Sequence, residues 1–329
     1  MTPTDQSQPP LPVLRLNQGD PSEARIYYGV HFVAEALGFF RAEGVAVEFQ
    51  VAGTGGHTVR GGQVPAVLAG GAELTVGGPM VTMKMLEDGE DRLVSFCAVA
   101  AGNPWILAGP AGAPTVELED LAGKTIVDVA NVGTATMTFL WLLAKVGIEL
   151  SSVTLVPGSG DEAADVASVA AGTYDFALHS LHALAPYIVS GRLSISAELA
   201  GPTGAVPWSA YIARPERIAA MRSEFVAFVR AIARAQAFMA MEPAIFTAKL
   251  VSEAYPGYPL DGLVAGFDGY HASGVLAPSP AISRADFERF SALLVDVGWL
   301  QRAASFDILV DNSLADAAVH VLSKRERKA

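Results

Sequence analysis

Residues 27–51 read YYGVHFVAEALGFFRAEGVAVEFQV, and this stretch contains the pattern that decides the fold. Apolar residues recur at three- to four-residue spacing over 27–42, which predicts a helix with one buried face. Gly44 follows, and glycine readily adopts the left-handed conformation that ends a helix. Residues 45–51 are rich in Val and Phe, which is typical of a strand. A helix that ends at glycine and leads into a strand is the repeating unit of an α/β sheet.

The same unit recurs on both sides of this stretch, along the first two hundred residues. We expect strands at 13–16, 45–51, 74–76, 93–100 and 104–109, and, after the pattern restarts near residue 118, at 125–130, 153–156, 174–178 and 193–199. We expect helices between them at 64–70, 134–146, 162–171 and 181–190. Two such series predict an α/β protein with two lobes, each a doubly wound, mainly parallel sheet.

Helical patterns predominate after residue 200. We expect helices at 215–241, 244–255, 259–273 and 283–296, packed on the first lobe as a C-terminal helical segment. The predicted domains are 12–108 with 203–310 for lobe 1, and 109–202 for lobe 2. Residues 1–11 form a polar, Pro-rich leader that we expect to be disordered, and 311–329 form a C-terminal tail.

Composition excludes several classes of protein. The chain has 329 residues, 51% of them hydrophobic, and a formal net charge of −12, so nucleic acid is an unsuitable partner. Its single cysteine, Cys97, cannot form a disulfide framework or a cysteine-based metal cluster. No apolar run is long enough to insert into a membrane. The N-terminus carries no signal peptide pattern, so we expect a cytoplasmic protein as written, or a periplasmic or cell-surface protein if an export signal was removed.

The glycine-rich segment 53–62 follows the second predicted strand, where α/β proteins bind ligands. Its sequence, GTGGHTVRGG, includes Gly56, His57 and Arg60. Glycine lets backbone N–H groups approach an anion, and arginine pairs with a carboxylate or sulfonate through two bonds. We predict that these three residues contact a ligand. The alternative is a flexible loop with a solvated arginine.

Other candidate ligand contacts also follow predicted strands. They are Tyr27, Tyr28, His31, Gly78, Gly133, Thr134, Thr136, His179 and Ser180. The tyrosines can wall a binding cleft or pack in the core, and Thr134 can hold a ligand anion or cap its helix. His179 and His182 alone fall short of the three or four ligands that a zinc site needs, so we expect no metal and no cofactor.

Four segments resemble landmarks of the type II periplasmic binding proteins, in the branch that holds aliphatic-sulfonate and taurine binders and thiamine-pyrimidine synthase-like proteins. They are 36–49 (ALGFFRAEGVAVEF), 70–77 (GGAELTVG), 118–126 (LEDLAGKTI) and 171–177 (AGTYDFA). The resemblance runs from about 12 to 300. It implies a two-lobe fold with a ligand cleft between the lobes.

Within that branch, His57, the run 60–65 (RGGQVP) and 311–314 (DNSL) are similar to the aromatic sulfinate desulfinases. Those enzymes carry a histidine and an arginine in the corresponding loop, and a nucleophilic cysteine after the first strand. Here that region holds Tyr27 and Tyr28 and no cysteine, which removes the thiolate that such chemistry needs. The pyrimidine synthases similarly use a cysteine-rich segment, which this chain lacks.

The sequence therefore predicts a substrate-binding protein of the ABC-transporter type. It would close by a hinge around a small anionic or aromatic molecule, such as a sulfonate or a pyrimidine-like compound, and deliver it to an ABC permease. The alternative is a cytoplasmic enzyme on the same fold, a desulfinase-like or other lyase or hydrolase that acts on an aromatic acid through His57 and Arg60. A third possibility is a ligand sensor that signals through a partner protein.

Overall fold

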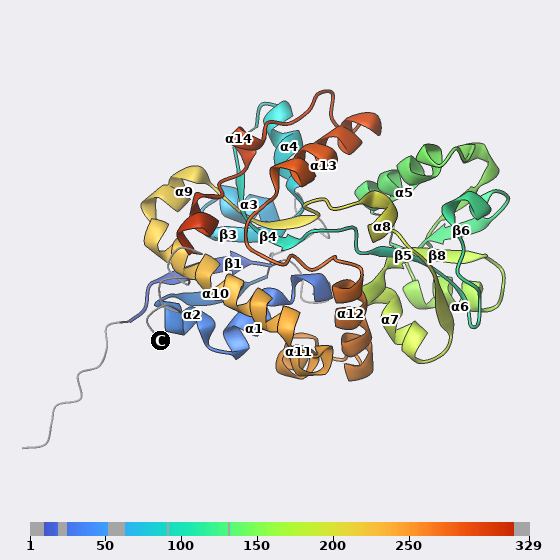
Figure 1. Ribbon diagram of the computed structural model, residues 1–329, viewed down its shortest axis with the longest axis horizontal. Coiled ribbons are helices and arrows are strands. Elements are labelled where there is room, and N and C mark those ends of the chain that lie inside the picture. The colour runs from blue at the N-terminus through green and yellow to red at the C-terminus, as the bar shows by residue number, and fades with distance from the viewer. Residues whose placement is uncertain (1–9, 19–24, 52–62, 91, 131, 319–329) are drawn as a thin grey trace, which may run out of the picture.

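The computed structural model describes residues 10–18, 25–51, 63–90, 92–130 and 132–318, and these fold into two lobes that lie side by side (Figure 1). Each lobe is built on one five-stranded sheet. The first sheet has the strand order β2 (Ala46–Gln50), β1 (Val13–Asn17), β3 (Leu74–Gly77), β10 (Ser209–Ala213) and β4 (Val94–Ala100). The second has the order β7 (Thr154–Pro157), β6 (Thr125–Asp128), β8 (Phe176–Ser180), β5 (Trp105–Pro110) and β9 (Leu193–Glu198). The predicted two-lobe α/β fold is confirmed.

Each sheet contains one reversed strand, and it is the strand that arrives from the other lobe. In the first sheet β1 pairs in parallel with β2 and β3, whereas β10 runs antiparallel to β3 and β4. In the second sheet β6 pairs in parallel with β7 and β8, whereas β5 runs antiparallel to β8 and β9. Four strands of each sheet therefore point the same way, as the mainly parallel prediction requires. The chain crosses between the lobes at 101–104 and 199–208.

The predicted boundary of lobe 1 at residue 108 is wrong by one strand. Because β5 pairs with β8 and β9, it belongs to the second sheet, and the chain leaves the first lobe before Trp105. An apolar run identifies a strand but does not specify the sheet that it joins. Asn103 lies buried at this crossover, where its side chain bonds to Thr203 of the returning crossover and to the Trp105 amide.

The helix predicted over 27–42 is broken into three pieces. They are η2 (Ile26–Tyr28), α1 (Val30–Ala36) and α2 (Phe39–Glu43). Gly38 separates the last two because its φ of 66° is left-handed, which glycine adopts without steric cost. The helix predicted over 215–241 likewise divides at Met221 into α9 (Pro215–Ala220) and α10 (Arg222–Met241).

The remaining helices cover both lobes. In the first lobe they include α3 (Val64–Leu68), α4 (Pro79–Glu87), which was not predicted, α11 (Ala244–Val251), α12 (Leu260–Ala272), α13 (Arg284–Asp296) and α14 (Phe306–Leu309). In the second they are α5 (Gly133–Lys145), α6 (Glu162–Ala170) and α7 (Leu181–Val189), with the short α8 (Ala200–Thr203) at the returning crossover. No helix in the described part of the chain is both long and apolar enough to cross a bilayer.

Two expectations for the C-terminal region need correction. The helical segment does not pack on the first lobe alone, because α12 also packs against α7 of the second lobe. The predicted tail begins inside the fold, because Leu314, Ala315 and Ala318 are buried and the Asp311 amide donates to the Ser95 carbonyl of β4. The predicted leader falls almost wholly outside the described residues.

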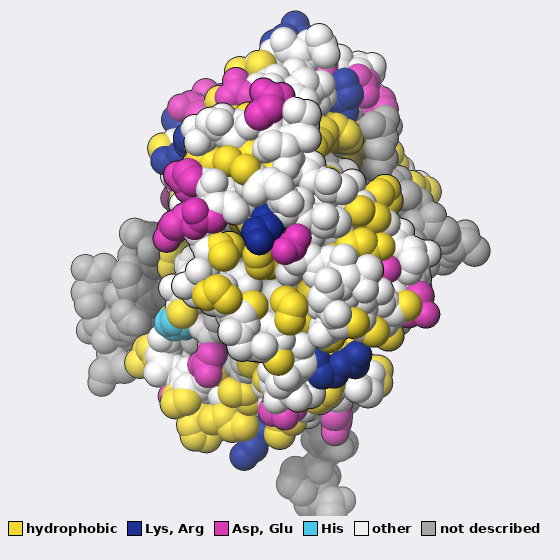
Figure 2. All heavy atoms as spheres, turned by 90° about the vertical axis from the view of Figure 1, so that its right-hand side faces the viewer, with side chains coloured by type: hydrophobic (Ala, Val, Ile, Leu, Met, Phe, Trp, Pro, Cys, Tyr) yellow, Lys and Arg dark blue, Asp and Glu magenta, His cyan; other side chains and the backbone are white. Residues whose placement is uncertain are grey.

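The surface at the second-lobe end carries separated basic side chains among more numerous acidic ones (Figure 2). The described residues on that face form no continuous basic patch. A polyanion would therefore find no complementary surface on this face.

Candidate functional site

Tyr27 and Tyr28 lie in η2, between the end of β1 and the start of α1. Both rings are buried, and they meet edge to face with centroids 4.7 Å apart. The Tyr27 hydroxyl accepts a hydrogen bond of 3.1 Å from the Arg25 guanidinium. The sequence places both tyrosines correctly after the first strand. Arg25 was not among the predicted contacts. The signal that could have identified it is an arginine two residues before a pair of aromatic residues.

His31 is buried on α1, with 1% of its surface exposed. Its Nε2 lies 3.1 Å from the Gln18 side-chain oxygen, and its Nδ1 lies 3.0 Å from the Tyr211 hydroxyl. An amide oxygen only accepts, so Nε2 carries the proton and Nδ1 accepts from Tyr211. Burial lowers the pKa of His31 to about 3, and the ring is neutral at pH 7. His31 therefore holds the side chain of Gln18, which follows β1, and contributes no positive charge at pH 7.

His179 and Ser180 are the last two residues of β8 rather than the first residues after it, as had been predicted, and they form a series of polar contacts with His182 on α7. The Ser180 amide donates to His179 Nδ1 at 2.7 Å, and Ser180 Oγ lies 3.0 Å from that atom and 2.9 Å from His182 Nδ1. Since His179 Nδ1 accepts, its proton is on Nε2, which lies 3.7 Å from a Glu162 carboxylate oxygen. The His179 ring stacks on Trp105 at the start of β5.

The imidazoles of His179 and His182 are neutral at pH 7. Burial, assisted by the nearby positive charge of Arg25, lowers the pKa of His179 to about 3. Burial, His179 and Arg25 together hold the pKa of His182 well below its usual value. The rings can donate and accept hydrogen bonds but carry no charge at pH 7.

His182 joins the two groups across the lobes. Its ring lies 5.8 Å from Tyr27 of the first lobe and 6.1 Å from His179 of the second. Its backbone N–H donates to the Tyr270 hydroxyl at 2.9 Å, and its carbonyl accepts from the Tyr258 hydroxyl. The structure thus brings Tyr27, Tyr28, His179 and Ser180 into one cluster around His182.

The start of α5 lies in the second lobe, as predicted, but its cap differs from the expectation. The N-cap residue is Val132, so Thr134 stands inside the first turn and does not cap it. Thr136 Oγ1 donates to Asp128 at the end of β6. Gly133 is exposed, and a Cβ there would meet nothing within 4 Å. The Thr136 hydroxyl is therefore engaged within its own lobe.

Gly78 follows β3, as predicted, and immediately precedes α4, which was not predicted. A Cβ on Gly78 would lie 1.9 Å from the Met80 sulfur and 3.5 Å from the Trp208 carbonyl of the returning crossover. These atoms leave no room for a Cβ, so packing explains why residue 78 is glycine. Gly56, His57 and Arg60 lie outside the described residues, so their predicted ligand contacts stay predictions.

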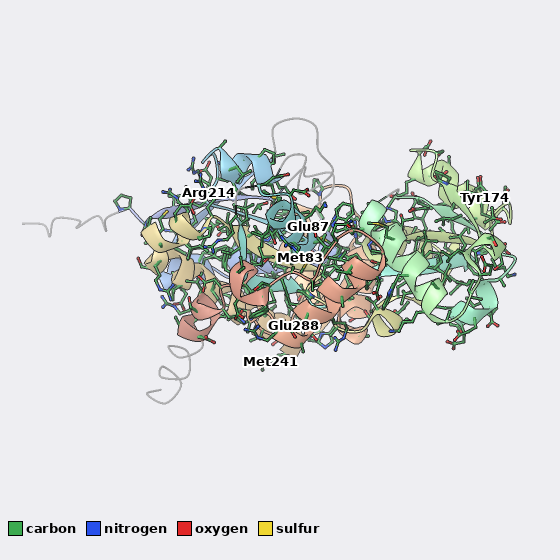
Figure 3. The ribbon with its side chains drawn as sticks, turned by 90° about the horizontal axis from the view of Figure 1, so that it is seen from above. Met83, Glu87, Tyr174, Arg214, Met241 and Glu288 are labelled. Atoms are coloured by element: carbon green, nitrogen blue, oxygen red, sulfur yellow. The ribbon has the colours of Figure 1, made fainter. Side chains whose placement is uncertain are left out.

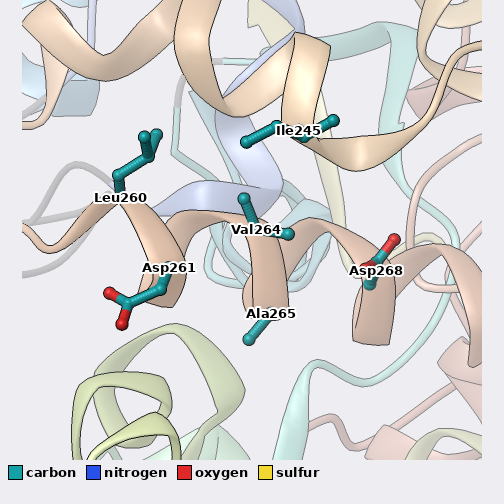
Figure 4. Close-up of a pocket in the computed structure, with 6 residues that line it drawn as sticks. All are labelled: Ile245, Leu260, Asp261, Val264, Ala265 and Asp268. Carbon is teal, nitrogen blue, oxygen red and sulfur yellow. The ribbon is translucent and has the colours of Figure 1, made fainter.

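A hollow lies between α11 and α12 (Figure 4). It is lined by Ile245, Leu260, Asp261, Val264, Ala265 and Asp268. Its apolar floor carries two carboxylates, which repel an anion. No predicted site residue lines it. Elsewhere in the described ranges, no three His, Cys, Asp or Glu side chains converge as a metal site requires.

Comparison with protein families gives a match over most of the chain. Residues 26–245 match the family model described as NMT1/THI5 like. A binding protein named YtlA, from Bacillus subtilis (strain 168), is 20% identical over 292 residues, which cover 88% of this chain and 86% of YtlA.

Two solved structures show the same fold. The alkanesulfonate-binding protein SsuA from Xanthomonas axonopodis pv. citri, bound to MOPS, has a TM-score of 0.63 and 16% identity, covering 93% of this chain and 99% of SsuA. The desulfurization enzyme DszB in complex with biphenyl-2-sulfinic acid has a TM-score of 0.68 and 14% identity, covering 94% of this chain and 99% of DszB. At such identities the likeness establishes the fold.

Proposed function

The chain belongs to the NMT1/THI5-like family, and from that premise we propose that it is a substrate-binding protein of the ABC-importer type. In this proposal it holds a small anionic organic molecule with an apolar or aromatic part between its lobes. The observation that carries the proposal is the cluster around His182, where ring contacts join the strand ends of two separate lobes. Residues from both lobes at one place are what a protein needs to enclose a ligand by closing.

Two relatives support the ligand class. YtlA is named as a binding protein, and the SsuA structure holds MOPS, which is a sulfonate. The neutral, partly buried imidazoles and the buried tyrosines of the cluster suit a molecule that is mostly apolar with one acidic group. We extend the proposal to His57, Arg60 and the start of α5 as further contacts. An Arg60→Ala change is expected to weaken binding by about 1.5–3 kcal/mol, the typical value of a hydrogen bond to a charged group.

The enzyme alternative has one observation in its favour, the fold shared with DszB. The chemistry of this chain opposes it. Cys97, the chain's single cysteine, is buried in β4, and burial raises the pKa of its thiol. A thiol held protonated inside a sheet cannot act as a nucleophile. We therefore favour binding without turnover.

The test measures binding and turnover on the same sample. Purified protein is mixed with MOPS, benzenesulfonate or biphenyl-2-sulfinate in a sulfonate-free buffer, and melting temperature, calorimetric binding and sulfite release are recorded. A binding protein raises its melting temperature with at least one acid and returns it unchanged. Catalytic release of sulfite would replace this proposal with the enzyme alternative. The absence of binding to any acid would contradict both.

The proposal also implies a partner and a place. Delivery to an importer requires an ABC permease and a location outside the cytoplasmic membrane. Fractionation of the native organism with an antibody against the chain tests the location. Recovery of the protein solely with cytoplasmic markers would contradict an importer role and favour a cytoplasmic sensor.

A further inference from the structure

The hollow between α11 and α12 is an apolar groove with two carboxylates, and we call it the α11–α12 groove. Its lining is the set of six residues shown in Figure 4, and it encloses about 570 Å³. Leu260, Val264 and Asp268 project from the side of α12 that faces Ile245 of α11 (Figure 4). They follow one another at four-residue spacing, which places side chains on one face of a helix. The groove therefore has a continuous wall along α12.

Large apolar side chains are exposed at this groove. Leu260, which lines it, is 41% exposed, and Phe246, the neighbour of the lining residue Ile245, is 52% exposed. Val264 and Ala265 in the lining are half-buried. A single exposed apolar residue is ordinary, but several around one hollow mark a surface that another molecule covers.

The groove also carries negative charge. Asp261 and Asp268 are both exposed, and they stand seven positions apart on α12, which corresponds to about 10 Å along the helix axis. The Asp261 side chain accepts a hydrogen bond of 3.0 Å from the Gly262 amide. In the described part of the chain, neither carboxylate forms an ion pair. Lys249, in the last turn of α11, does not line the groove. A molecule that covers the groove must therefore bring positive charge to both carboxylates, since an unpaired charge is costly to remove from water.

We propose that the α11–α12 groove docks an amphipathic helix of a partner protein, which presents an apolar stripe flanked by Lys or Arg. A helix laid in such a groove contacts it with residues i, i+3, i+4 and i+7. Basic residues seven positions apart on the partner helix match the spacing of Asp261 and Asp268, because the two helices have the same rise per residue. Apolar contact supplies most of the affinity, and the charges set the orientation and the rate of association. The proposal goes beyond the proposed function and does not depend on it.

Charge and exposure disfavour the other occupants. A second copy of the chain would bring the same two carboxylates and a net charge of −12 to the contact, and an anionic membrane would also be repelled. A small organic cation would remain largely in water, because Leu260 and both aspartates are exposed, whereas ligand pockets bury most of a small ligand. A basic helix is long enough to cover the exposed apolar residues.

The experiment uses two synthetic helical peptides that differ only in charge. Both have leucines at i, i+3, i+4 and i+7 along one face. The basic peptide has lysines on both sides of the leucine stripe, and the acidic peptide has glutamates there. Fluorescence anisotropy of the labelled peptides measures binding to the full-length protein, and hydrogen exchange locates the protected segments. We expect the basic peptide to bind and to protect α11 and α12, and the acidic peptide not to bind.

A charge variant tests the two carboxylates. Asp261→Asn combined with Asp268→Asn should weaken binding of the basic peptide roughly 3- to 10-fold, the change that two exposed ion pairs produce. The control combines Glu119→Gln with Glu149→Gln, two exposed carboxylates of the second lobe. Both double variants raise the net charge by the same amount, so general attraction of a basic peptide to an acidic protein affects them equally. The control should bind the basic peptide nearly as the parent does.

An apolar variant tests the wall of the groove. Leu260→Gln should weaken binding of the basic peptide about 5- to 10-fold, because the peptide covers the exposed part of this side chain. Ile308→Gln is the matched control. Ile308 is also 41% exposed, but it lies on α14, on the opposite side of the first lobe (Figure 1). Melting temperatures of all variants report whether each is folded.

Several results would overturn the proposal while leaving the proposed function intact. They are the absence of binding by the basic peptide, protection outside α11 and α12, and equal losses in the two double variants. A parent protein that is dimeric in light scattering, and monomeric as Leu260→Gln, would assign the groove to a second copy instead. Displacement of the bound peptide by benzyltrimethylammonium would assign it to a small organic cation.

Discussion

The lobes meet at two helix pairs that differ sharply in burial. On one side α12 packs against α7, where the hydroxyls of Tyr258 and Tyr270 bond to the backbone of His182. On the other side α13 meets α5 through a hydrogen bond of 3.2 Å from Trp141 Nε1 to Asp296, which is exposed to solvent. Figure 1 shows the two pairs on opposite sides of the crossover segments.

The comparison indicates how the lobes can move. A buried contact with fixed hydrogen bonds resists separation, whereas an exposed polar contact exchanges with water at little cost. We therefore expect α12 and α7 to stay together when the lobes open or close, and α13 and α5 to separate. The predictions below test this difference, from the largest expected effect to the smallest.

Gly269 gives the strongest test of the buried contact. A Cβ on Gly269 would lie 2.4 Å from Leu181 Cδ2 of α7, and Leu181 is itself buried. Gly269→Val should therefore lower the free energy of unfolding by about 1–3 kcal/mol, the usual range for overpacking. Chemical denaturation measures it. Gly201→Val is the control, because a Cβ on Gly201 meets nothing within 4 Å. Equal stability of the two variants would mean that α12 and α7 do not pack tightly.

Acid should weaken the buried contact, because His179 at the end of β8 and His182 on α7 lie beside it and are neutral in the folded protein at pH 7. The folded pKa of His179, about 3, lies below its unfolded value near 6.5. The unfolded chain therefore takes up the proton first, and stability present above pH 6.5 declines as the pH falls toward 3.

The expected loss from His179 at pH 5.5 relative to pH 7.5 is about 1.4 kcal/mol. Denaturation curves at the two pH values measure it in the parent protein and in His179→Gln. In His179→Gln the loss of unfolding free energy between the two pH values should be smaller by about this amount. The contribution of His31 to the pH dependence should remain. Identical pH dependence in the two proteins would show that His179 is not held neutral by the fold.

Tyr258 tests one hydrogen bond of the buried contact. Tyr258→Phe removes the hydroxyl that donates to the His182 carbonyl, and we expect a loss of about 0.5–1.5 kcal/mol in unfolding free energy. Tyr174→Phe is the matched control. Tyr174 lies at the far end of the second lobe, away from α12 (Figure 3). A loss of unfolding free energy no larger than in the control would show that the hydrogen bond makes no net contribution to stability.

Much of the fold follows from local sequence signals. Strands that end or begin at glycine, and helices with three- to four-residue periodicity, were placed within a few residues of the observed elements. The α4 helix was missed because its run PMVTMKMLE carries little periodicity and follows a strand without a polar cap. The prediction that β5 belongs to the first lobe was wrong, because the sheet that a strand joins depends on pairing partners distant in sequence.

The sequence predicted where several candidate residues lie relative to the strands, but it did not predict the contacts that join residues of the two lobes. Tyr27 and Tyr28 lie between β1 and α1, and His179 and Ser180 are the last two residues of β8. The helix at 259–273 was predicted, but neither its contact with α7 nor the hydrogen bond from Arg25 to Tyr27 was foreseen, because the spacing of apolar residues does not specify such contacts. In the structure, Gly266 lets α12 approach Ile26 of the first lobe, and Gly269 lets it approach Leu181 of the second.

Trp141 should show the smallest effect and completes the comparison. Trp141→Phe removes the exposed hydrogen bond to Asp296 and weakens the contact with Lys145, whose ammonium lies 4.6 Å from the centre of the indole ring. We expect a change of at most about 0.5 kcal/mol in unfolding free energy, because exposed polar contacts contribute little net. The variant should instead shift the lobe separation measured by small-angle scattering toward the open form. A stability loss as large as that of Gly269→Val would contradict the view that the α13–α5 contact is the one that opens.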